Sequence, residues 1–211
     1  MSYPKPFQKL IKNFSSLPSI GPKHAERLVL FLFKKTKTEI EEFSENLLDI
    51  KNLRICQRCY NVSEGEFCQI CANSKRDQQT ICVVEEPLDI LSIERTHAFS
   101  GVYHVLGGVI TATEKDNTLK ISELLNRIKK ENTQEVILAT NPTTEGDATA
   151  LYLKRKLQQM EVSPVKSGSA AAPQSSRVKI TRLGRGLSTG ADLEYADEIT
   201  LSEALTNRKE L

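Results

Sequence analysis

The sequence predicts an α/β domain with a largely parallel sheet, preceded by an N-terminal helical unit and a small four-cysteine metal-binding element. Three observations support this prediction. Apolar residues recur at helical spacing near the N-terminus, four cysteines crowd into one short segment, and apolar runs later alternate with amphipathic stretches. We therefore expect four regions in the 211-residue chain, at residues 1–53, 54–78, 79–186 and 187–211.

The first region is expected to form three short helices. Apolar side chains at helical spacing predict the first helix, namely Phe7, Leu10, Ile11 and Phe14. Turn formers then interrupt the pattern, and Pro22 suits the first turn of a second helix. A capping box of Thr38 and Glu41 is predicted to begin the third helix. That helix is expected to turn four apolar side chains inward, namely Ile40, Phe43, Leu47 and Ile50.

The segment LPSIGPKHAER (residues 17–27) resembles a helix–hairpin–helix DNA-binding element. In such an element, backbone N–H groups at the hairpin and the positive end of the next helix bind a phosphate. Lys23 and Arg27 lie four residues apart on one helical face, so both are candidate DNA contacts with no preference for base sequence. The alternative is a plain helical hairpin with solvated cations, and Ser19 stands where the motif usually has its first glycine.

Two Cys-x2-Cys pairs are typical of a tetrahedral S4 zinc site. Their members are Cys56, Cys59, Cys68 and Cys71. Because four protein ligands leave no position for a reactive water, one structural Zn²⁺ per chain is predicted. Metal binding would supply most of the folding energy of so short a segment, on the order of 10–16 kcal/mol. The alternative is a set of free or redox-active cysteines, whereas Cys82 is interpreted as a small buried hydrophobe.

Strands and helices are expected to alternate after residue 79, which favours a three-layer domain. Strands are predicted at residues 81–84, 102–106, 136–139 and 177–182, and helices at 118–130 and 146–160. The second of these helices carries Ala148, Leu151 and Tyr152. Residues 163–176 are low in complexity and predict a flexible loop. A short strand near residues 198–201 and a final helix from Ser202 are expected to follow.

Acidic or polar groups follow two of the predicted strands, where open α/β sheets place their sites. Glu85 and Glu86 follow the first strand, and the segment NPTTEGD (residues 141–147) follows another. The second segment resembles the acidic motif D-x-D-x-E-G of Toprim domains, which holds Mg²⁺ for phosphoryl transfer. Asn141 and Thr143 stand at the two aspartate positions, so a magnesium ion would lose two negative charges. We therefore expect no catalytic residues.

The ordered motifs resemble the bacterial RecR family of recombination mediators over nearly the whole chain. The stretches that carry the match include IGPKHAERL, CQRC…CQIC, VVEEPLDILSIERT, GVYHVLGG, ATNPTTEGDATALYL and DLEYADEITL. The resemblance implies a Toprim-like fold and a ring-shaped homotetramer that clamps DNA. It implies that, with RecO and RecF, the protein helps load RecA onto single strands coated by single-strand-binding protein, without catalysis.

The resemblance also assigns residues. Lys23 and Arg27 fall where the family's DNA-contacting residues lie, Glu145 and Asp147 lie on the face expected to contact RecO, and the C-terminal segment is expected to contact another subunit. The rival hypothesis is a Mg²⁺-dependent Toprim enzyme that uses Glu85 or Glu86 with Glu145 and Asp147. A third hypothesis is a zinc-stabilised module that binds only protein.

Composition and charge indicate the class of protein, its expected location and the charge of its partner. The chain is 39% hydrophobic and 27% charged, which is typical of a globular protein. No apolar stretch is long enough for a membrane span and no signal peptide is recognised, so a cytoplasmic, nucleoid-associated location is expected. Residues 1–60 hold 11 basic against 6 acidic residues, which indicates an anionic partner for this part of the chain.

Overall fold

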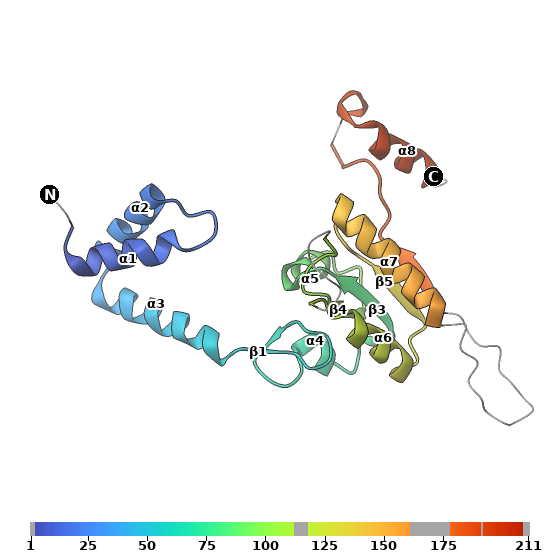
Figure 1. The fold of residues 1–211 in the computed structure, drawn as a ribbon, viewed down its shortest axis with the longest axis horizontal. Helices are drawn as coiled ribbons and strands as arrows, with labels where there is room; N and C mark the ends of the chain where they lie inside the picture. The colour runs from blue at the N-terminus through green and yellow to red at the C-terminus, as the bar shows by residue number, and fades with distance from the viewer. Residues whose placement is uncertain (1–2, 112–117, 161–177, 191, 209–211) are drawn as a thin grey trace, which may run out of the picture. The chain divides into compact units, whose positions relative to one another are not determined.

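The computed structural model describes residues 3–111, 118–160, 178–190 and 192–208 (Figure 1). The low-complexity segment 163–176 lies outside these described residues. The chain forms two compact units, Met1–Leu53 and Arg54–Leu211. Each unit is described by itself below.

The N-terminal unit consists of helices. They are α1 (Lys5–Ser15), α2 (Pro22–Phe33), α3 (Lys37–Asp49) and a 3₁₀ turn, η1 (Ile50–Asn52). Helices α1 and α2 pack against each other, and Ala25 and Val29 of α2 are buried. The predicted apolar face of α1 is half-buried along its length. Pro22 occupies the first turn of α2, as the sequence predicts.

Helix α3 differs from the prediction in its cap and in its orientation. The capping box is formed by Thr36 and Glu39: the Glu39 N–H donates to the Thr36 hydroxyl at 3.3 Å, and the Thr36 N–H donates to the Glu39 carboxylate at 2.8 Å. Thr38 and Glu41 lie too far along the chain for this role, because the helix has already begun at Lys37. Three side chains expected to point inward are exposed, namely Phe43, Leu47 and Ile50. No described element of the same unit covers this face of α3.

The second unit begins with the cysteine-bearing segment. Strands β1 (Arg54–Ile55) and β2 (Val62–Ser63) pair antiparallel, and the one-turn helix α4 (Gln69–Ala72) follows. The four buried cysteines make a small cluster of their own, with Ile70 packed against it. The segment therefore has little apolar core apart from the cysteines.

A four-stranded parallel sheet forms the centre of the second unit, which confirms the predicted α/β class. Its strands are β3 (Asp77–Val84), β4 (Gly101–Val105), β5 (Glu135–Leu138) and β6 (Lys179–Arg182), in the order β4-β3-β5-β6. Residues Ile81–Val84 of β3 are buried on both faces. This double burial explains why the sequence shows a continuous apolar run there instead of an alternating one.

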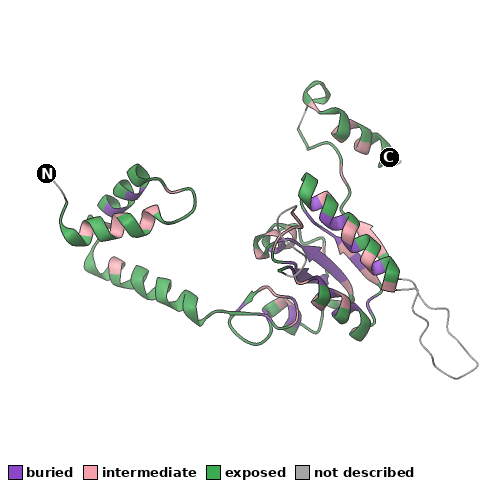
Figure 2. Cartoon of the chain, in the orientation of Figure 1, coloured by how far each residue is buried: buried purple, intermediate pink, exposed green. Residues whose placement is uncertain are grey.

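Two layers cover the sheet, and the buried residues gather between them and the strands (Figure 2). Helices α6 (Ile121–Lys130) and α7 (Thr144–Met160) pack on one face. Helix α5 (Pro87–Glu94) and the cysteine-bearing segment pack on the other. In α7, Ala150, Leu153 and Leu157 are buried in the core and Tyr152 packs against it, whereas Ala148 and Leu151 are exposed.

The C-terminal segment contains a 3₁₀ turn, η2 (Leu193–Tyr195), and helix α8 (Glu198–Thr206). The expected strand at residues 198–201 is wrong, because these residues form the first turn of α8. Asp197 caps the helix by accepting a hydrogen bond from the Thr200 N–H at 2.9 Å. None of the described helices is long and apolar enough to span a membrane.

Candidate functional site

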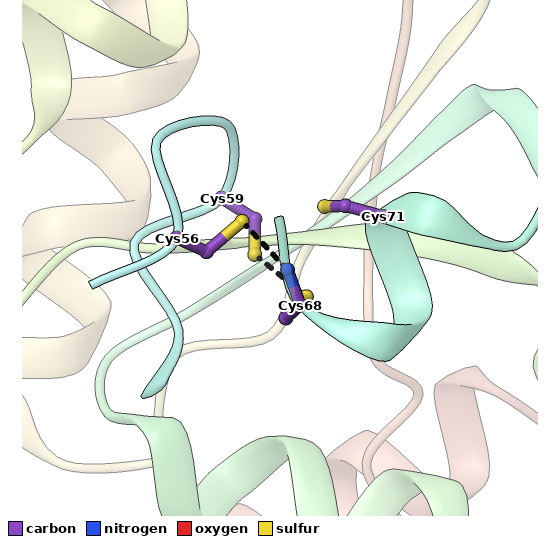
Figure 3. Close-up of side chains that lie close together, drawn as sticks. All are labelled: Cys56, Cys59, Cys68 and Cys71. Atoms are coloured by element: carbon purple, nitrogen blue, oxygen red, sulfur yellow. Dashed lines mark hydrogen bonds between the residues drawn. The ribbon is translucent and has the colours of Figure 1, made fainter. Parts of the chain in front are cut away.

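The four cysteines of the predicted metal site converge in the structure (Figure 3). Cys56 and Cys59 lie after β1, whereas Cys68 and Cys71 lie at the start of α4 and within it. All four are buried, and their Sγ atoms lie within 4.8 Å of one another. A tetrahedral zinc ion with bonds of about 2.3 Å places its sulfurs about 3.8 Å apart, so this cluster has the size of a zinc centre.

Hydrogen bonds link the four cysteines of the cluster to one another. The backbone N–H of Cys68 donates to the Cys56 Sγ at 3.3 Å. Cys59, Cys68 and Cys71 share hydrogen bonds, with the Sγ atoms of Cys59 and Cys68 3.5 Å apart, and this sharing lowers the pKa of the Cys68 thiol while the pKa values of the Cys59 and Cys71 thiols are raised. Because a metal ligand must be deprotonated, a zinc ion that binds here displaces the remaining thiol protons, and its binding is expected to weaken at low pH. Zinc bound to four thiolates supplies a structural crosslink and no open coordination position.

Hydrogen bonds and ion pairs connect the cysteine-bearing segment to the edge of the sheet and to helix α6. The N–H of Val105 in edge strand β4 donates to the carbonyl oxygen of Cys59 at 2.8 Å. Glu131, at the end of α6, accepts from Arg58 at 2.8 Å and from Arg127 at 2.9 Å. Arg127 also donates to the carbonyl oxygen of Tyr103 in β4 at 2.6 Å. Sequence reasoning missed this network because its members are far apart along the chain and match no motif.

The predicted DNA-contacting residues are exposed on α2. Lys23 and Arg27 lie in the first half of the helix, after Gly21, which caps it with no side-chain hydrogen bond. Ser19 adopts a left-handed conformation with φ +64°. That conformation explains the glycine usual at this position, because a β-carbon there costs about 1–2 kcal/mol. The hairpin therefore keeps its tight turn despite the serine.

The acidic groups at the carboxyl end of the sheet are engaged by donors. Glu85 is only 8% exposed, and its carboxylate accepts from the Asn141 N–H at 2.7 Å and from the Asn141 side-chain amide at 2.6 Å. Gly146 allows this close approach, because a β-carbon there would collide with the Asn141 carbonyl and the Glu85 carboxylate. The amide of Asn141 thus occupies the side of Glu85 that a cation would need.

The two other acidic residues of this segment differ in their surroundings. Asp147 pairs with both Arg182 and Arg185. Arg185, followed by Arg182, lowers the pKa of the Asp147 carboxyl, which keeps it ionised. Glu145 is exposed at the start of α7. The structure therefore brings Glu85, Asn141 and Gly146 together, but it leaves Glu145 outside their contacts.

Comparison with known proteins matches these features in order along the chain. Family models match the RecR helix–hairpin–helix at residues 7–51, the RecR four-cysteine zinc finger domain at 53–73, a Toprim domain at 79–166 and the RecR C-terminal region at 186–209. The protein named recombination protein RecR from Herpetosiphon aurantiacus is 45% identical, with 99% of this chain and 96% of that protein aligned. The chain belongs to the RecR family.

Other RecR proteins align over the same length. Recombination protein RecR of Chloroflexus aurantiacus is 46% identical over 98% of this chain and 95% of its own. That of Rubrobacter xylanophilus is 40% identical over 100% of this chain and 99% of its own. The match to the RecR zinc finger domain, together with the sulfur cluster, confirms the predicted structural zinc site.

Proposed function

We propose that the chain is a non-enzymatic recombination mediator in DNA repair. In this proposal it forms a homotetrameric clamp that binds DNA independently of sequence in the cytoplasm, at the nucleoid. With RecO and RecF it helps load RecA onto single-stranded DNA coated by single-strand-binding protein. The observation that carries the proposal is the polar end of the sheet, where a RecR-family Toprim domain has an amide in place of a metal site.

We propose that the chain is not an enzyme because the carboxylates that could bind Mg²⁺ already have partners within the chain. The Asn141 amide holds the Glu85 carboxylate, and two arginines hold Asp147. Mg²⁺ is bound through carboxylates and gives up its water reluctantly, so it competes poorly with groups that are already in place. The alternative Mg²⁺-dependent enzyme requires cleavage or synthesis of DNA that depends on Mg²⁺ and is lost in Glu145→Ala. We expect neither activity with labelled DNA and Mg²⁺ or Mn²⁺, and observing it would overturn the proposal.

DNA binding is proposed to reside in the hairpin and α2. Lys23 and Arg27 are exposed on one face beyond the tight turn at Ser19, so a phosphate backbone can approach both. Two cations neutralise few phosphates, so the affinity of one subunit is expected to be low. Linking four such surfaces in one assembly raises the effective concentration and compensates for this weakness.

The RecO-binding surface is proposed to include Glu145 and Asp147. Glu145 is exposed and offers its carboxylate to a basic partner group. Asp147 is shared with Arg182 and Arg185, so a partner must compete with these arginines for it. We therefore expect Glu145→Gln to weaken RecO binding more than Asp147→Asn does.

The decisive experiment compares two charge-matched double variants. Lys23→Ala with Arg27→Ala is expected to weaken DNA binding at least about tenfold at low salt and to reduce its salt dependence, because two phosphate contacts are lost. Lys9→Ala with Lys12→Ala removes the same charge from exposed positions of α1 and is expected to have a smaller effect. Fluorescence anisotropy with labelled DNA gives both affinities. Equal affinities for the two variants would remove the hairpin from the proposal.

A further inference from the structure

A cavity of about 630 Å³ lies between the cysteine-bearing segment and helix α6. Its wall includes Arg58 and Phe67 from the segment, and Asn126, Arg127 and Lys130 from the helix. All these residues belong to the second unit. The volume lies in the range of sites that bind small ligands or single nucleotides.

The two carboxylates on the cavity wall already accept hydrogen bonds within the chain. Glu131 gives one carboxylate oxygen to Arg58 and the other to Arg127. Glu123 gives one oxygen to Lys120 at 3.5 Å and the other to the Ser122 hydroxyl at 2.7 Å. A ligand that donates to either carboxylate would therefore compete with these contacts.

Two cations of the wall have donor groups that no described acceptor uses. Arg127 is nine-tenths buried, and its Nη2 has no partner among the described residues. No described carboxylate pairs with the exposed ammonium group of Lys130. The Arg127 Nη2 atom is buried, so a ligand reaches it only if the wall shifts, whereas the exposed ammonium group of Lys130 is open to a ligand with acceptor atoms.

The cavity also offers an aromatic surface. Phe67 is 49% exposed, and no described aromatic ring stacks on it. An exposed phenylalanine beside unpaired donors is suited to a flat ring that carries acceptor atoms, as nucleobases do.

Charge decides how such a ligand is oriented. Cys71 lies in the cavity wall, and zinc bound to four thiolates carries a net charge of about −2. A phosphate is disfavoured beside that wall, whereas an uncharged base is not. The phosphate is favoured at the exposed Lys130, which lies on α6 and not on the cysteine-bearing segment.

We propose that this cavity binds one nucleotide of a single-stranded DNA, with the base against Phe67 and the adjoining phosphate on Lys130. The proposal rests on the proposed DNA-binding function and adds a second contact to it, separate from the hairpin. A base inside a duplex is stacked and paired and cannot enter. The cavity therefore selects single strands, which the hairpin cannot do because it contacts only the backbone.

The test measures the affinity of the zinc-loaded full-length chain for a single-stranded oligonucleotide and for a duplex of equal length. Phe67→Ala is expected to weaken single-strand binding at least about fivefold and to leave duplex binding unchanged. Phe67→Tyr keeps a ring and is expected to restore binding. On a strand with abasic sites, Phe67→Ala is expected to have no further effect.

The phosphate contact of Lys130 is tested separately, through the salt dependence of DNA affinity and with a matched control variant. Lys130→Ala is expected to lower the slope of log affinity against log salt by about 0.7 for single strands, the value of one phosphate contact. Lys129→Ala removes the same charge from the next exposed position of α6, outside the cavity wall, and should leave the slope unchanged. Zinc content, measured with a metal-sensitive dye, checks that the Phe67 variants keep their metal centre.

The outcomes separate this proposal from the proposed function. Equal losses for single strands and duplexes in Phe67→Ala, or equal slopes in Lys130→Ala and Lys129→Ala, would overturn the nucleotide site. If the Lys23→Ala, Arg27→Ala variant loses DNA affinity in the same assay, the hairpin function stands even where the cavity variants change nothing. If the cavity variants alone lose affinity, the cavity stands and the hairpin fails.

Discussion

Asn141 stands at the first aspartate position of the Toprim motif D-x-D-x-E-G. Its side chain donates a hydrogen bond to a carboxylate, which an ionised aspartate cannot do. Its amide donates to the buried carboxylate of Glu85, whereas an aspartate would repel that carboxylate unless a cation lay between them. The sequence predicts the loss of charge at this position. It does not predict the hydrogen bond that fills the space, because that bond depends on how closely Gly146 allows the two strand ends to approach.

The Asn141→Asp variant tests this interpretation. Losing the amide donor and placing a second carboxylate beside Glu85 is expected to lower the free energy of unfolding by about 1.5–3 kcal/mol at pH 7. Millimolar Mg²⁺ should restore part of that loss in the variant and should leave the unmodified chain unchanged. Thermal unfolding with and without Mg²⁺ measures both effects. A variant as stable as the unmodified chain without Mg²⁺ would show that the Asn141 amide does not stabilise this site.

His104 predicts a dependence of stability on pH. Its side chain is fully buried in β4, Nε2 donates to the Lys120 carbonyl at 2.8 Å, and Nδ1 has no partner among the described residues. Burial therefore lowers its pKa from 6.5 to about 4. Between these values the unfolded chain binds a proton that the folded chain does not, so stability falls as the pH drops below 6.5 and is constant above it.

The expected loss is about 2 kcal/mol between pH 7 and pH 5, at roughly 1.4 kcal/mol per pH unit. His104→Gln retains a donor for the Lys120 carbonyl but does not titrate. Urea unfolding of the two proteins at several pH values measures the difference, and any release of zinc at low pH affects both alike. Parallel pH profiles would show that His104 does not titrate as the burial requires.

At the scale of the elements, the sequence predicted which segments are helices and strands better than it predicted their faces and ends. Periodicity identified α1, α2, α6 and the four strands of the sheet. It misplaced the cap of α3 because Thr36 and Thr38 are both followed by a glutamate three residues later. It mistook the first turn of α8 for a strand, because a four-residue run is too short to separate the two periods. The contacts between elements, such as Glu131 with Arg58, leave no local signal.

Zinc removal is expected to speed hydrogen exchange in strand β4, because the cysteine-bearing segment is hydrogen-bonded to this strand. With zinc bound, the Val105 amide is expected to exchange slowly, because it donates to the Cys59 carbonyl. A strong chelator, or Cys56→Ser, should unfold the segment and speed exchange at Val105 at least about tenfold. The Val83 amide, in a central strand paired on both sides, should change far less. Hydrogen exchange followed by mass spectrometry or NMR checks this, and unchanged Val105 protection without zinc would show that metal and sheet are uncoupled.

At the scale of the whole molecule, the N-terminal unit exposes more apolar surface than an isolated subunit is expected to leave in water. Leu47 and Leu48 on α3 are 59% and 71% exposed, and Phe31 and Phe33 on α2 are exposed as well. Contiguous apolar surfaces of this kind mark protein interfaces. We therefore expect another subunit to cover this face of α3. Helical periodicity predicts that a face is buried, but it does not show which molecule buries it.

This surface gives a prediction about the native mass. The unmodified chain is expected to form a particle of about four times the 23.6 kDa chain mass. Leu47→Glu with Leu48→Glu places two charges on the apolar face of α3, and burying them unpaired costs several kcal/mol, so the particle should dissociate into smaller species. Leu88→Glu with Leu91→Glu, at two exposed positions of α5, adds the same charge and should keep the native mass. Light scattering coupled to size exclusion measures all three. In the proposed clamp, affinity comes from linked subunits, so the dissociated variant should also bind DNA more weakly while Lys23 and Arg27 remain intact. A single-chain mass for the unmodified protein would contradict the tetramer, and an unchanged mass in the double variant would place the subunit contact elsewhere.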